Sequence, residues 1–259
     1  MLNTFAKHLK KDWEELGSLD PLYAVLSHAE KKNGHWDEQE FFATGKKEIN
    51  ELMKVLQEIG LPRERLTALD FGCGVGRLTR ALSSFFASVT GLDISESMVV
   101  EAKKRHADFP TCTFLSQTQP HLRIFFDHSF DLVYSSIVLQ HVPNLDTVKA
   151  YLAEFVRILK PDGIAVFQIP VRIPWRSRLQ PQQRLYHLLR SLGVSSKRLY
   201  RWNLLPISMN AMEEGMVRAT VERAGGRIVA VEANNFSGPK VESKMFYVTK
   251  NSLVRLGHA

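Results

Sequence analysis

The stretch Asp70-Phe-Gly-Cys-Gly-Val-Gly76 decides the fold of this chain of 259 residues, and an apolar run at Leu66–Phe71 leads into it. Glycines spaced by two let the backbone turn tightly and let a ligand approach the main chain. A helix is predicted next, near Arg77–Phe86, and the N–H groups of its first turn would be free to bind a carboxylate or a phosphate. The segment therefore predicts a strand, a ligand-binding loop and a helix in succession.

A second apolar run, Ser88–Asp93, ends in an acidic residue 17 positions after Gly76. A carboxylate at the end of a second strand can accept hydrogen bonds from both hydroxyls of a ribose. The strand, the glycine loop, the helix and Asp93 together favour a nucleoside-binding site over the alternative, a tight turn and a surface acid that bind nothing. The spacing Gly-x-Gly-x-Gly differs from the Gly-x-Gly-x-x-Gly of dinucleotide sites, which disfavours a nicotinamide-dependent oxidoreductase.

Outward from this centre, short apolar runs alternate with stretches of helical periodicity, which predicts βαβ units and a parallel sheet with helices on both faces. Further strands are expected at Cys112–Ser116, Asp131–Ser135 and Ile164–Ile169, and further helices near Ser97–His106 and Leu145–Leu159. The last two strands, Arg227–Glu232 and Lys244–Thr249, follow one another without a helix between them. Such strands pair antiparallel, so the sheet is expected to end in an antiparallel hairpin.

Four segments in this order resemble the class I S-adenosylmethionine-dependent methyltransferases, specifically their small-molecule branch: Leu69–Thr79, Gly91–Met98, Phe130–Val142 and Leu159–Gly163. The resemblance covers about residues 66–170. It implies an α/β fold of the Rossmann-like type, with a seven-stranded, mostly parallel sheet that ends in an antiparallel hairpin. It also implies S-adenosylmethionine as the cofactor and methyl transfer as the activity.

The resemblance implies a role for each residue of the cofactor site. The methionine part of the cofactor would be lined by Asp70, Gly72, Cys73, Gly74 and Gly76, with Ser135 near its amino group. Asp93 would hold the ribose, and Ile94 and Met98 would pack on the adenine; core packing is the alternative for these two. The family usually has Asp or Asn after the third strand to bind the adenine amino group, and Gln117 stands there in this chain. Cys73 is interpreted as a small packing residue rather than a nucleophile.

His141, just after the fourth strand, is the candidate general base, because a hydroxyl acceptor must lose a proton during methyl transfer. The alternative is that Gln140-His141 caps a turn and braces the cofactor loop. Tyr23 is a candidate partner of this histidine in the substrate site, by resemblance to small-molecule relatives, with packing as the favoured alternative. The fourth strand ends in Tyr134-Ser135-Ser136 without acidic ligands, and the other eight histidines lack metal-ligand spacing, so no metal site is predicted.

The net charge of +7 comes from one segment, residues 171–212, which holds eight basic residues and no Asp or Glu. Without those eight, 26 basic residues face 27 acidic ones, so the remainder of the chain is close to neutral and no nucleic-acid partner is expected. Two functional interpretations stay open: a lid whose Arg176 and Arg184 bind an anionic acceptor, and a helix that touches an anionic membrane. The alternative is a solvated helical pair whose leucines pack on the domain, namely Leu185, Leu188, Leu189 and Leu192.

A single domain with four parts is expected: a helical arm at 1–62, the cofactor-binding core at 63–170, the basic helical insert at 171–212, and a terminal helix and hairpin at 213–259. The first residues lack the charged and apolar regions of a signal peptide, so none is expected, and the sequence has no apolar run long enough to span a membrane. It has only two cysteines, which together with these features favours the cytoplasm. The sequence carries no signal for the oligomeric state.

We therefore expect an enzyme that transfers a methyl group from S-adenosylmethionine to a small-molecule acceptor, at a hydroxyl oxygen in the first place. One alternative is a methyltransferase that acts on an amine, on carbon or on a lipid delivered from a membrane. Another is a protein of this fold that binds the cofactor without turnover.

Overall fold

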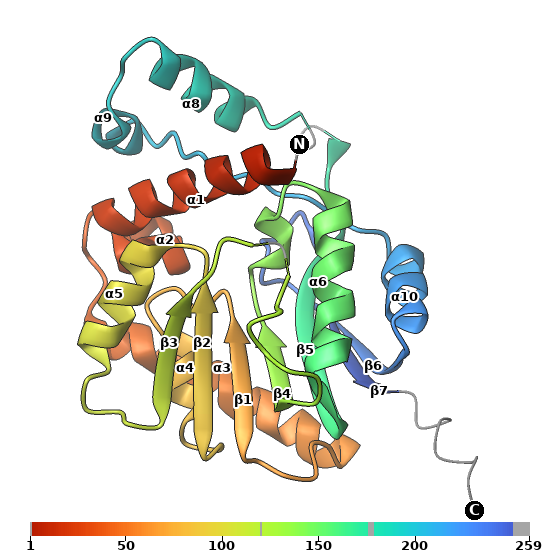
Figure 1. Ribbon diagram of the computed structural model, residues 1–259. Coiled ribbons are helices and arrows are strands. Elements are labelled where there is room, and N and C mark those ends of the chain that lie inside the picture. Colours follow the sequence, from red (N-terminus) through yellow and green to blue (C-terminus); the bar gives the residue numbers. More distant parts are fainter. Residues whose placement is uncertain (1, 120, 176–178, 251–259) are drawn as a thin grey trace, which may run out of the picture.

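The computed structural model describes residues 2–119, 121–175 and 179–250, which fold around a seven-stranded sheet. The strands are β1 (Thr67–Phe71), β2 (Ser88–Asp93), β3 (Cys112–Ser116), β4 (Phe130–Ser135), β5 (Leu159–Arg172), β6 (Gly226–Asn234) and β7 (Glu242–Lys250). Their order is β3-β2-β1-β4-β5-β7-β6 (Figure 1). Strands β1 to β5 pair in parallel, and β7 runs antiparallel between β5 and β6. This confirms the expected α/β sheet with its terminal antiparallel hairpin.

Strand β5 is longer than predicted, because it begins at Leu159 rather than Ile164. Leu159 pairs with Phe130 of β4, and the register then shifts before Leu132. The Lys-Pro-Asp-Gly sequence at 160–163 has the composition of a turn, but it lies in this irregular part of the strand. The four residues thus lie at an irregularity of the ladder, between the pairs Phe130–Leu159 and Leu132–Ile164.

Helices cover both faces of the sheet, as Figure 1 shows. On one face, α6 (Leu145–Ile158) and α10 (Glu214–Arg223) pack against the strands with side chains such as Val148, Leu152, Phe155, Val217 and Val221. On the other face, α3 (Glu38–Ile59) and α4 (Arg77–Leu82) pack with side chains such as Ile49, Leu52, Leu56, Leu78 and Leu82. Helix α5 (Glu96–Arg105) packs on β3 and β2 at the edge of the sheet. Both faces are thus buried, and ligands are expected at the carboxyl ends of the strands.

The first part of the N-terminal arm, residues 2–25, and the insert lie together above the carboxyl ends of the parallel strands, at the top of Figure 1. The arm contributes α1 (Leu2–Leu19) and α2 (Pro21–Val25), and the insert contributes α8 (Pro181–Ser191) and α9 (Ser196–Arg201). Glu15 of α1 accepts hydrogen bonds from Tyr186 Oη at 2.7 Å and from Arg190 Nη2 at 2.6 Å. We call α1, α2 and residues 179–212 the cap.

The leucines of α8 were expected to pack on the domain in one interpretation of the sequence, but most of them lie on its outer face. Leu185, Leu188 and Leu192 are exposed, with exposed fractions of 44%, 57% and 72%, whereas Tyr186 is buried. The packing interpretation is therefore wrong for these three leucines. The reason is the position of Glu15, because its bonds to Tyr186 and Arg190 turn the leucine face of α8 away from the domain.

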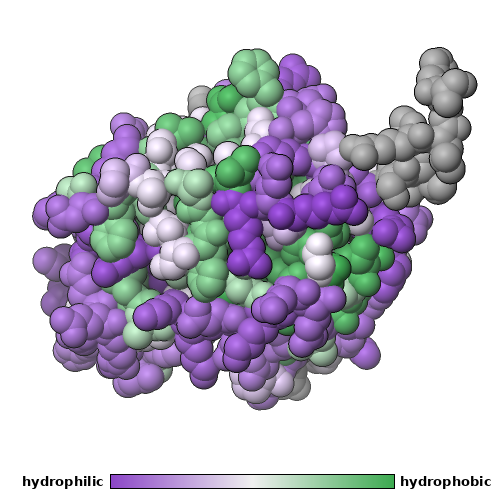
Figure 2. Space-filling view, turned by 90° about the horizontal axis from the view of Figure 1, so that it is seen from below, coloured by the Kyte–Doolittle hydropathy of each residue, from purple (hydrophilic) through white to green (hydrophobic). Residues whose placement is uncertain are grey.

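The face opposite the cap carries many polar side chains. Figure 2 shows this face from below, with hydrophilic side chains around its rim and apolar ones in patches between them. In the described part of the chain, no helix is both long and apolar enough to cross a membrane.

Helices α3 and α4 approach each other closely at Gly45. A Cβ atom at this position would lie 2.5 Å from the backbone oxygen of Arg77. Beside it, Arg77 Nη2 donates to Glu48 Oε2 at 2.7 Å, and Tyr134 Oη donates to Glu48 Oε1 at 2.9 Å. Since Arg77 begins α4 directly after the glycine loop, these contacts fix that loop against α3.

Replacing Gly45 by Ala should lower the free energy of unfolding by about 1–3 kcal/mol, because the added methyl group meets a backbone atom that cannot move aside easily. The matched control is Gly215→Ala in α10, where a Cβ atom meets nothing within 4 Å. That change should raise stability by up to about 1 kcal/mol, since alanine favours a helix over glycine. Urea unfolding monitored by circular dichroism measures both variants. Wild-type stability of Gly45→Ala would contradict the close approach.

Candidate active site

A cavity of about 890 Å³ lies between the carboxyl ends of the strands and the cap. This volume is near the upper end of the range of about 300–1,000 Å³ found for ligand pockets, so it suits more than one small ligand. The strand side of its wall includes Gly72, Cys73, Gly74, Asp93, Ile94, Met98 and Gln117. The cap side includes Trp13, Val25, Gln182, Leu205, Ile207 and Met209.

The glycine loop forms the wall next to the end of β1. Gly72, Gly74 and Gly76 have φ angles of 80°, 52° and 85°, in the left-handed region that residues with a side chain rarely adopt. A Cβ atom at Gly72 would overlap with Val138, and one at Gly74 would lie 2.5 Å from Val25 of α2. The loop can therefore follow this path and contact its neighbours only with glycine at these positions.

Asp93 joins the end of β2 to the glycine loop. Its Oδ2 accepts a hydrogen bond from the N–H of Gly74 at 2.8 Å, and its Oδ1 accepts one from the N–H of Ser95 at 2.9 Å. Burial raises the pKa of Asp93 above the usual value of an aspartate. An ionised carboxylate has about four acceptor positions, so capacity is left for ligand hydroxyl groups.

Gln117 follows β3 and lies on the same wall as Ile94 and Met98. Its Nε2 donates to the backbone oxygen of His121, whereas its buried Oε1 has no hydrogen-bond partner among the described residues. A buried acceptor without a partner is costly, so this oxygen is suited to a ligand N–H donor.

Three predicted site residues lie beneath the cavity and not in its wall: Asp70, Gly76 and Ser135. The carboxylate of Asp70 accepts a hydrogen bond from Thr79 Oγ1 at 2.6 Å, and burial raises its pKa to about 7. Ser135 Oγ donates to the backbone oxygen of Phe71 at 3.2 Å. Asp70 and Ser135 thus fix the strand ends and the helix that carry the glycine loop.

Cys73 also lies in the cavity wall, but its buried side chain favours the unreactive thiol form. Burial raises the pKa of Cys73 well above the usual value, so the reactive thiolate is disfavoured. The geometry agrees with the interpretation of Cys73 as a small packing residue.

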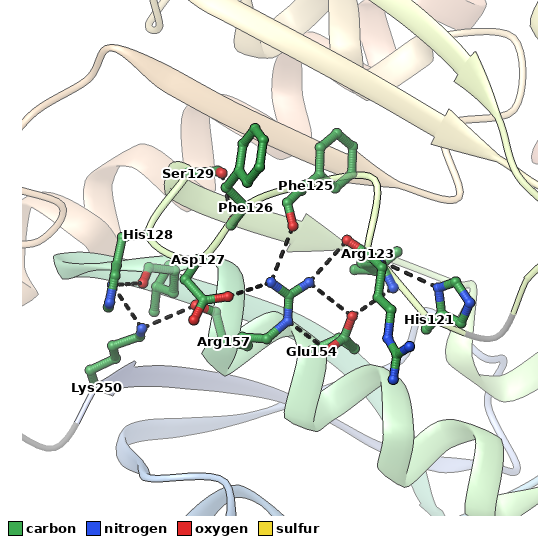
Figure 3. Close-up of polar contacts among 12 residues, drawn as sticks. His121, Arg123, Phe125, Phe126, Asp127, His128, Ser129, Glu154, Arg157 and Lys250 are labelled. Atoms are coloured by element: carbon green, nitrogen blue, oxygen red, sulfur yellow. Dashed lines mark hydrogen bonds and ion pairs between the residues drawn. The ribbon is translucent and has the colours of Figure 1, made fainter.

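Arg157 of α6 holds the loop that follows Gln117 (Figure 3). Its guanidinium donates to both carboxylate oxygens of Glu154 at 2.7 and 2.9 Å, to Asp127 at 2.6 Å, and to the backbone oxygens of Leu122 and Phe125. The guanidinium also holds the pKa of Glu154 below its usual value. Since Leu122 lies in the cavity wall, this network positions one side of the ligand site.

His141 lies in the cavity wall with both ring nitrogens engaged by the protein. Gln140 Oε1 accepts from Ser237 Oγ at 2.6 Å, so Gln140 Nε2 donates to His141 Nε2 at 3.0 Å. Nδ1–H then donates to the backbone oxygen of Ser208 in the cap at 2.7 Å. Burial lowers the pKa of His141 to about 4, so the ring is neutral near pH 7.

The residues predicted for the acceptor site are not brought together. Tyr23 is buried in the arm and packs edge-on against Tyr200, with ring centroids 6.0 Å apart, whereas Trp13 is the aromatic neighbour of His141 at 5.4 Å. Arg184 is exposed on α8 and does not line the cavity. Arg176 lies outside the described residues.

The sequence did not reveal that Ile137, just after β4, has a strained backbone. Ile137 has a φ angle of 60°, which is rare for a β-branched residue and costs about 1–3 kcal/mol. Its N–H donates to Oε1 of the buried Gln168 at 3.0 Å, and Gln168 Nε2 donates to Ser237 Oγ at 2.7 Å. The sequence carries only a weak sign of this contact. A single glutamine in a strand, such as Gln168, does not indicate whether its side chain is buried or exposed.

Among the described residues, no group of three His, Cys, Asp or Glu side chains is arranged to hold a metal ion.

Comparison with known proteins adds to this geometry. Residues 69–167 match a family model described as a methyltransferase domain. Demethylmenaquinone methyltransferases of Staphylococcus aureus, from strains JH9 and Newman among others, are 29% identical over 207 residues, which is 77% of this chain and 82% of theirs. The chain is a class I S-adenosylmethionine-dependent methyltransferase.

Solved structures of methyltransferases share the fold of this methyltransferase. The magnesium protoporphyrin IX methyltransferase of Synechocystis PCC 6803, with bound S-adenosylhomocysteine, is 17% identical, with a TM-score of 0.62 over 95% of this chain and 99% of that one. An S-adenosylmethionine-dependent methyltransferase of Leishmania major is 15% identical, with a TM-score of 0.63 over 95% of this chain and 83% of that one.

The cavity wall of the methyltransferase fits S-adenosylmethionine. The carboxylate of Asp93 would bind the ribose hydroxyls, and the unpartnered Oε1 of Gln117 would accept from the adenine amino group. Ile94 and Met98 would supply the apolar surface for the adenine, and Gly72 and Gly74 would leave the backbone open to the methionine part.

Replacing Asp93 by Ala should weaken binding of S-adenosylhomocysteine about ten-fold or more, since hydrogen bonds to a charged group contribute about 1.5–3 kcal/mol. Isothermal titration calorimetry measures this affinity. Asp108→Ala is the matched control, because Asp108 is an exposed aspartate in the turn after α5. Unchanged affinity of Asp93→Ala would rule out the ribose contact.

Replacing Arg157 by Lys should lower both the melting temperature and the affinity for S-adenosylhomocysteine, because an ammonium group cannot replace the planar fork that bonds four residues. We expect an affinity loss of about three- to ten-fold, or about 1 kcal/mol. Arg218→Lys on α10 is the control, since Arg218 bonds only Glu214 among the described contacts. The role of the Arg157 network in the site is wrong if both variants bind like the wild-type enzyme.

Proposed function

We propose that this methyltransferase transfers a methyl group to a hydroxyl oxygen of a small, largely apolar acceptor. The observation that carries the proposal is the cavity, which extends from the glycine loop to a compartment under the cap. Trp13, Val25, Leu205 and Ile207 give this compartment an apolar wall, which suits an apolar ring or chain. The relatives named above for demethylmenaquinone and magnesium protoporphyrin IX act, by those names, on small organic molecules.

The chain's own contribution is to align two bound molecules and to exclude water. When bound, S-adenosylmethionine supplies the methyl group from a positively charged sulfur. The glycine loop and Asp93 would hold that molecule, and the cap would hold the acceptor at close range. The bonds of Glu15 to Tyr186 and Arg190 keep the two parts of the cap together, which favours a closed site.

For His141 we propose the bracing role. Its Nδ1–H bond to Ser208 ties the cap to the segment after β4, and its Nε2 is occupied by Gln140. A base is most effective when its pKa is near the working pH, and the pKa of about 4 is far below neutrality. An acceptor hydroxyl that is acidic enough to ionise near pH 7 fits this wall, because it needs no protein base.

Two substitutions separate bracing from general-base catalysis. His141→Asn keeps an N–H donor near the position of Nδ1 but has no basic nitrogen, and His141→Ala removes both. If His141 braces the cap, the Asn variant should keep kcat within about ten-fold of wild type, while the Ala variant loses more; a general base would contribute about 10²–10⁴-fold. A loss of about 100-fold or more in the Asn variant, with unchanged binding of S-adenosylhomocysteine, would restore the general-base interpretation.

The acceptor is tested by incubating the enzyme with methyl-labelled S-adenosylmethionine and organic extracts, followed by mass spectrometry of the labelled products. We expect the label on oxygen, as a methyl ether that releases it on chemical cleavage. Label on nitrogen or carbon would contradict a hydroxyl acceptor and favour the alternatives, an amine or a carbon acceptor.

We propose the cytoplasm as the compartment of this enzyme. The proposal is supported by Cys73 and Cys112, which are both free thiols.

A further inference from the structure

The outer face of α8 is an apolar stripe that nothing in the described structure covers. Leu185, Leu188 and Leu192 follow the i, i+3, i+7 spacing of one helix face, and all three are exposed. Leu179, just before α8, is 51% exposed, and Trp202, just after α9, is 56% exposed. Figure 1 shows α8 as the outermost helix of the cap, above α1.

The opposite face of α8 contacts α1. Tyr186 and Arg190 bond to Glu15, and His187 lies 3.7 Å from a carboxylate oxygen of Asp12. The two acids of α1 next to α8 thus lie on its inner side. The helix is anchored on one face and presents leucine on the other, so the exposure of the stripe follows from the fold.

Exposed basic side chains lie on the same two helices of the insert. Arg184 lies on α8, and Lys197, Arg198 and Arg201 lie on α9; all four are exposed. The segment 171–212 contains no Asp or Glu that would neutralise them. An apolar face flanked by Arg and Lys, with a tryptophan beside it, is the composition of helices that lie in the interface of anionic bilayers.

We propose that α8 and α9 dock this enzyme on the surface of an anionic lipid bilayer. The leucine stripe would enter the boundary between headgroups and acyl chains, and the four basic side chains would contact lipid phosphates. A nucleic acid would use the charges but leave the leucines exposed to water.

Docking in this orientation places the acceptor cavity next to the bilayer. The cavity wall includes Gln182 in the first turn of α8, and Leu205, Ile207 and Met209 just after α9. An apolar acceptor dissolved in the bilayer would therefore have a short path into the enzyme; this last step rests on the proposed function.

Vesicle flotation of the full chain tests the proposal without cofactor or acceptor, so its outcome is independent of the proposed function. The probes are vesicles of phosphatidylcholine alone and of phosphatidylcholine with phosphatidylglycerol. We expect the wild-type protein to float with the anionic vesicles and to bind them less as salt is added. The combined change Leu185→Gln, Leu188→Gln and Leu192→Gln should weaken this binding about ten-fold or more.

Two further variants complete the design. The control Leu66→Gln, Ile124→Gln and Phe126→Gln changes three exposed apolar residues outside the cap, with exposed fractions of 52%, 50% and 88%, and should bind vesicles like the wild type. Replacing Arg184, Lys197, Arg198 and Arg201 by Gln should abolish the preference for anionic lipid. All variants alter exposed side chains, and their melting temperatures check that the fold is kept.

The proposal is overturned if the wild-type protein does not float with anionic vesicles, or if the α8 variant floats as well as the control. Light scattering measures the oligomeric state and so tests the alternative that a second copy of this chain packs on the stripe. A wild-type dimer that the α8 variant converts to a monomer, without vesicle binding by either, would assign the stripe to self-association and overturn the membrane proposal.

Discussion

The carboxylate of Asp93 joins the ends of the first two parallel strands, and the rest of the active site depends on this junction. By accepting the N–H of Gly74, it holds the glycine loop at the end of β2. The missing side chain of Gly74 in turn leaves room for Val25, so that the arm can close directly over the loop. One acidic group therefore sets the position of the cofactor loop, and through that loop the position of the cap.

Strain in the segment after β4 is held by buried polar groups far away in the sequence. Ile137 keeps its left-handed backbone because Gln168 accepts its N–H, and Gln168 is itself bonded to Ser237. Ser237 also donates to Gln140, next to His141. Gln168 of β5 and Ser237 of the loop before β7 thus fix the segment that carries His141 in the cavity wall.

The strand ends, the glycine loop and the acid beside it could be predicted from the sequence because they depend on local patterns. A strand, a glycine turn and a helix occur within about 15 residues, and Asp93 ends the next apolar run. The acceptor half could not, because its contacts join residues such as Glu15 and Tyr186, which are 171 positions apart. Helical periodicity placed the leucines of α8 on one face, but it carried no information on whether that face points to the domain or to solvent. Similarly, the motif identified Asp70 without indicating that its carboxylate would bond Thr79 beneath the cavity.

The contacts between the arm and the insert also order the events of biosynthesis. Helix α1 leaves the ribosome first, but Glu15 and Asp20 meet Tyr186 and Tyr200 only after 171 and 180 further residues have been made. The strands from β1 to β5 are complete by Arg172, before any of these partners exist. During translation the nascent chain can therefore assemble its cofactor-binding half while the acceptor compartment is still open. Closure of that compartment is a late step that waits for the insert.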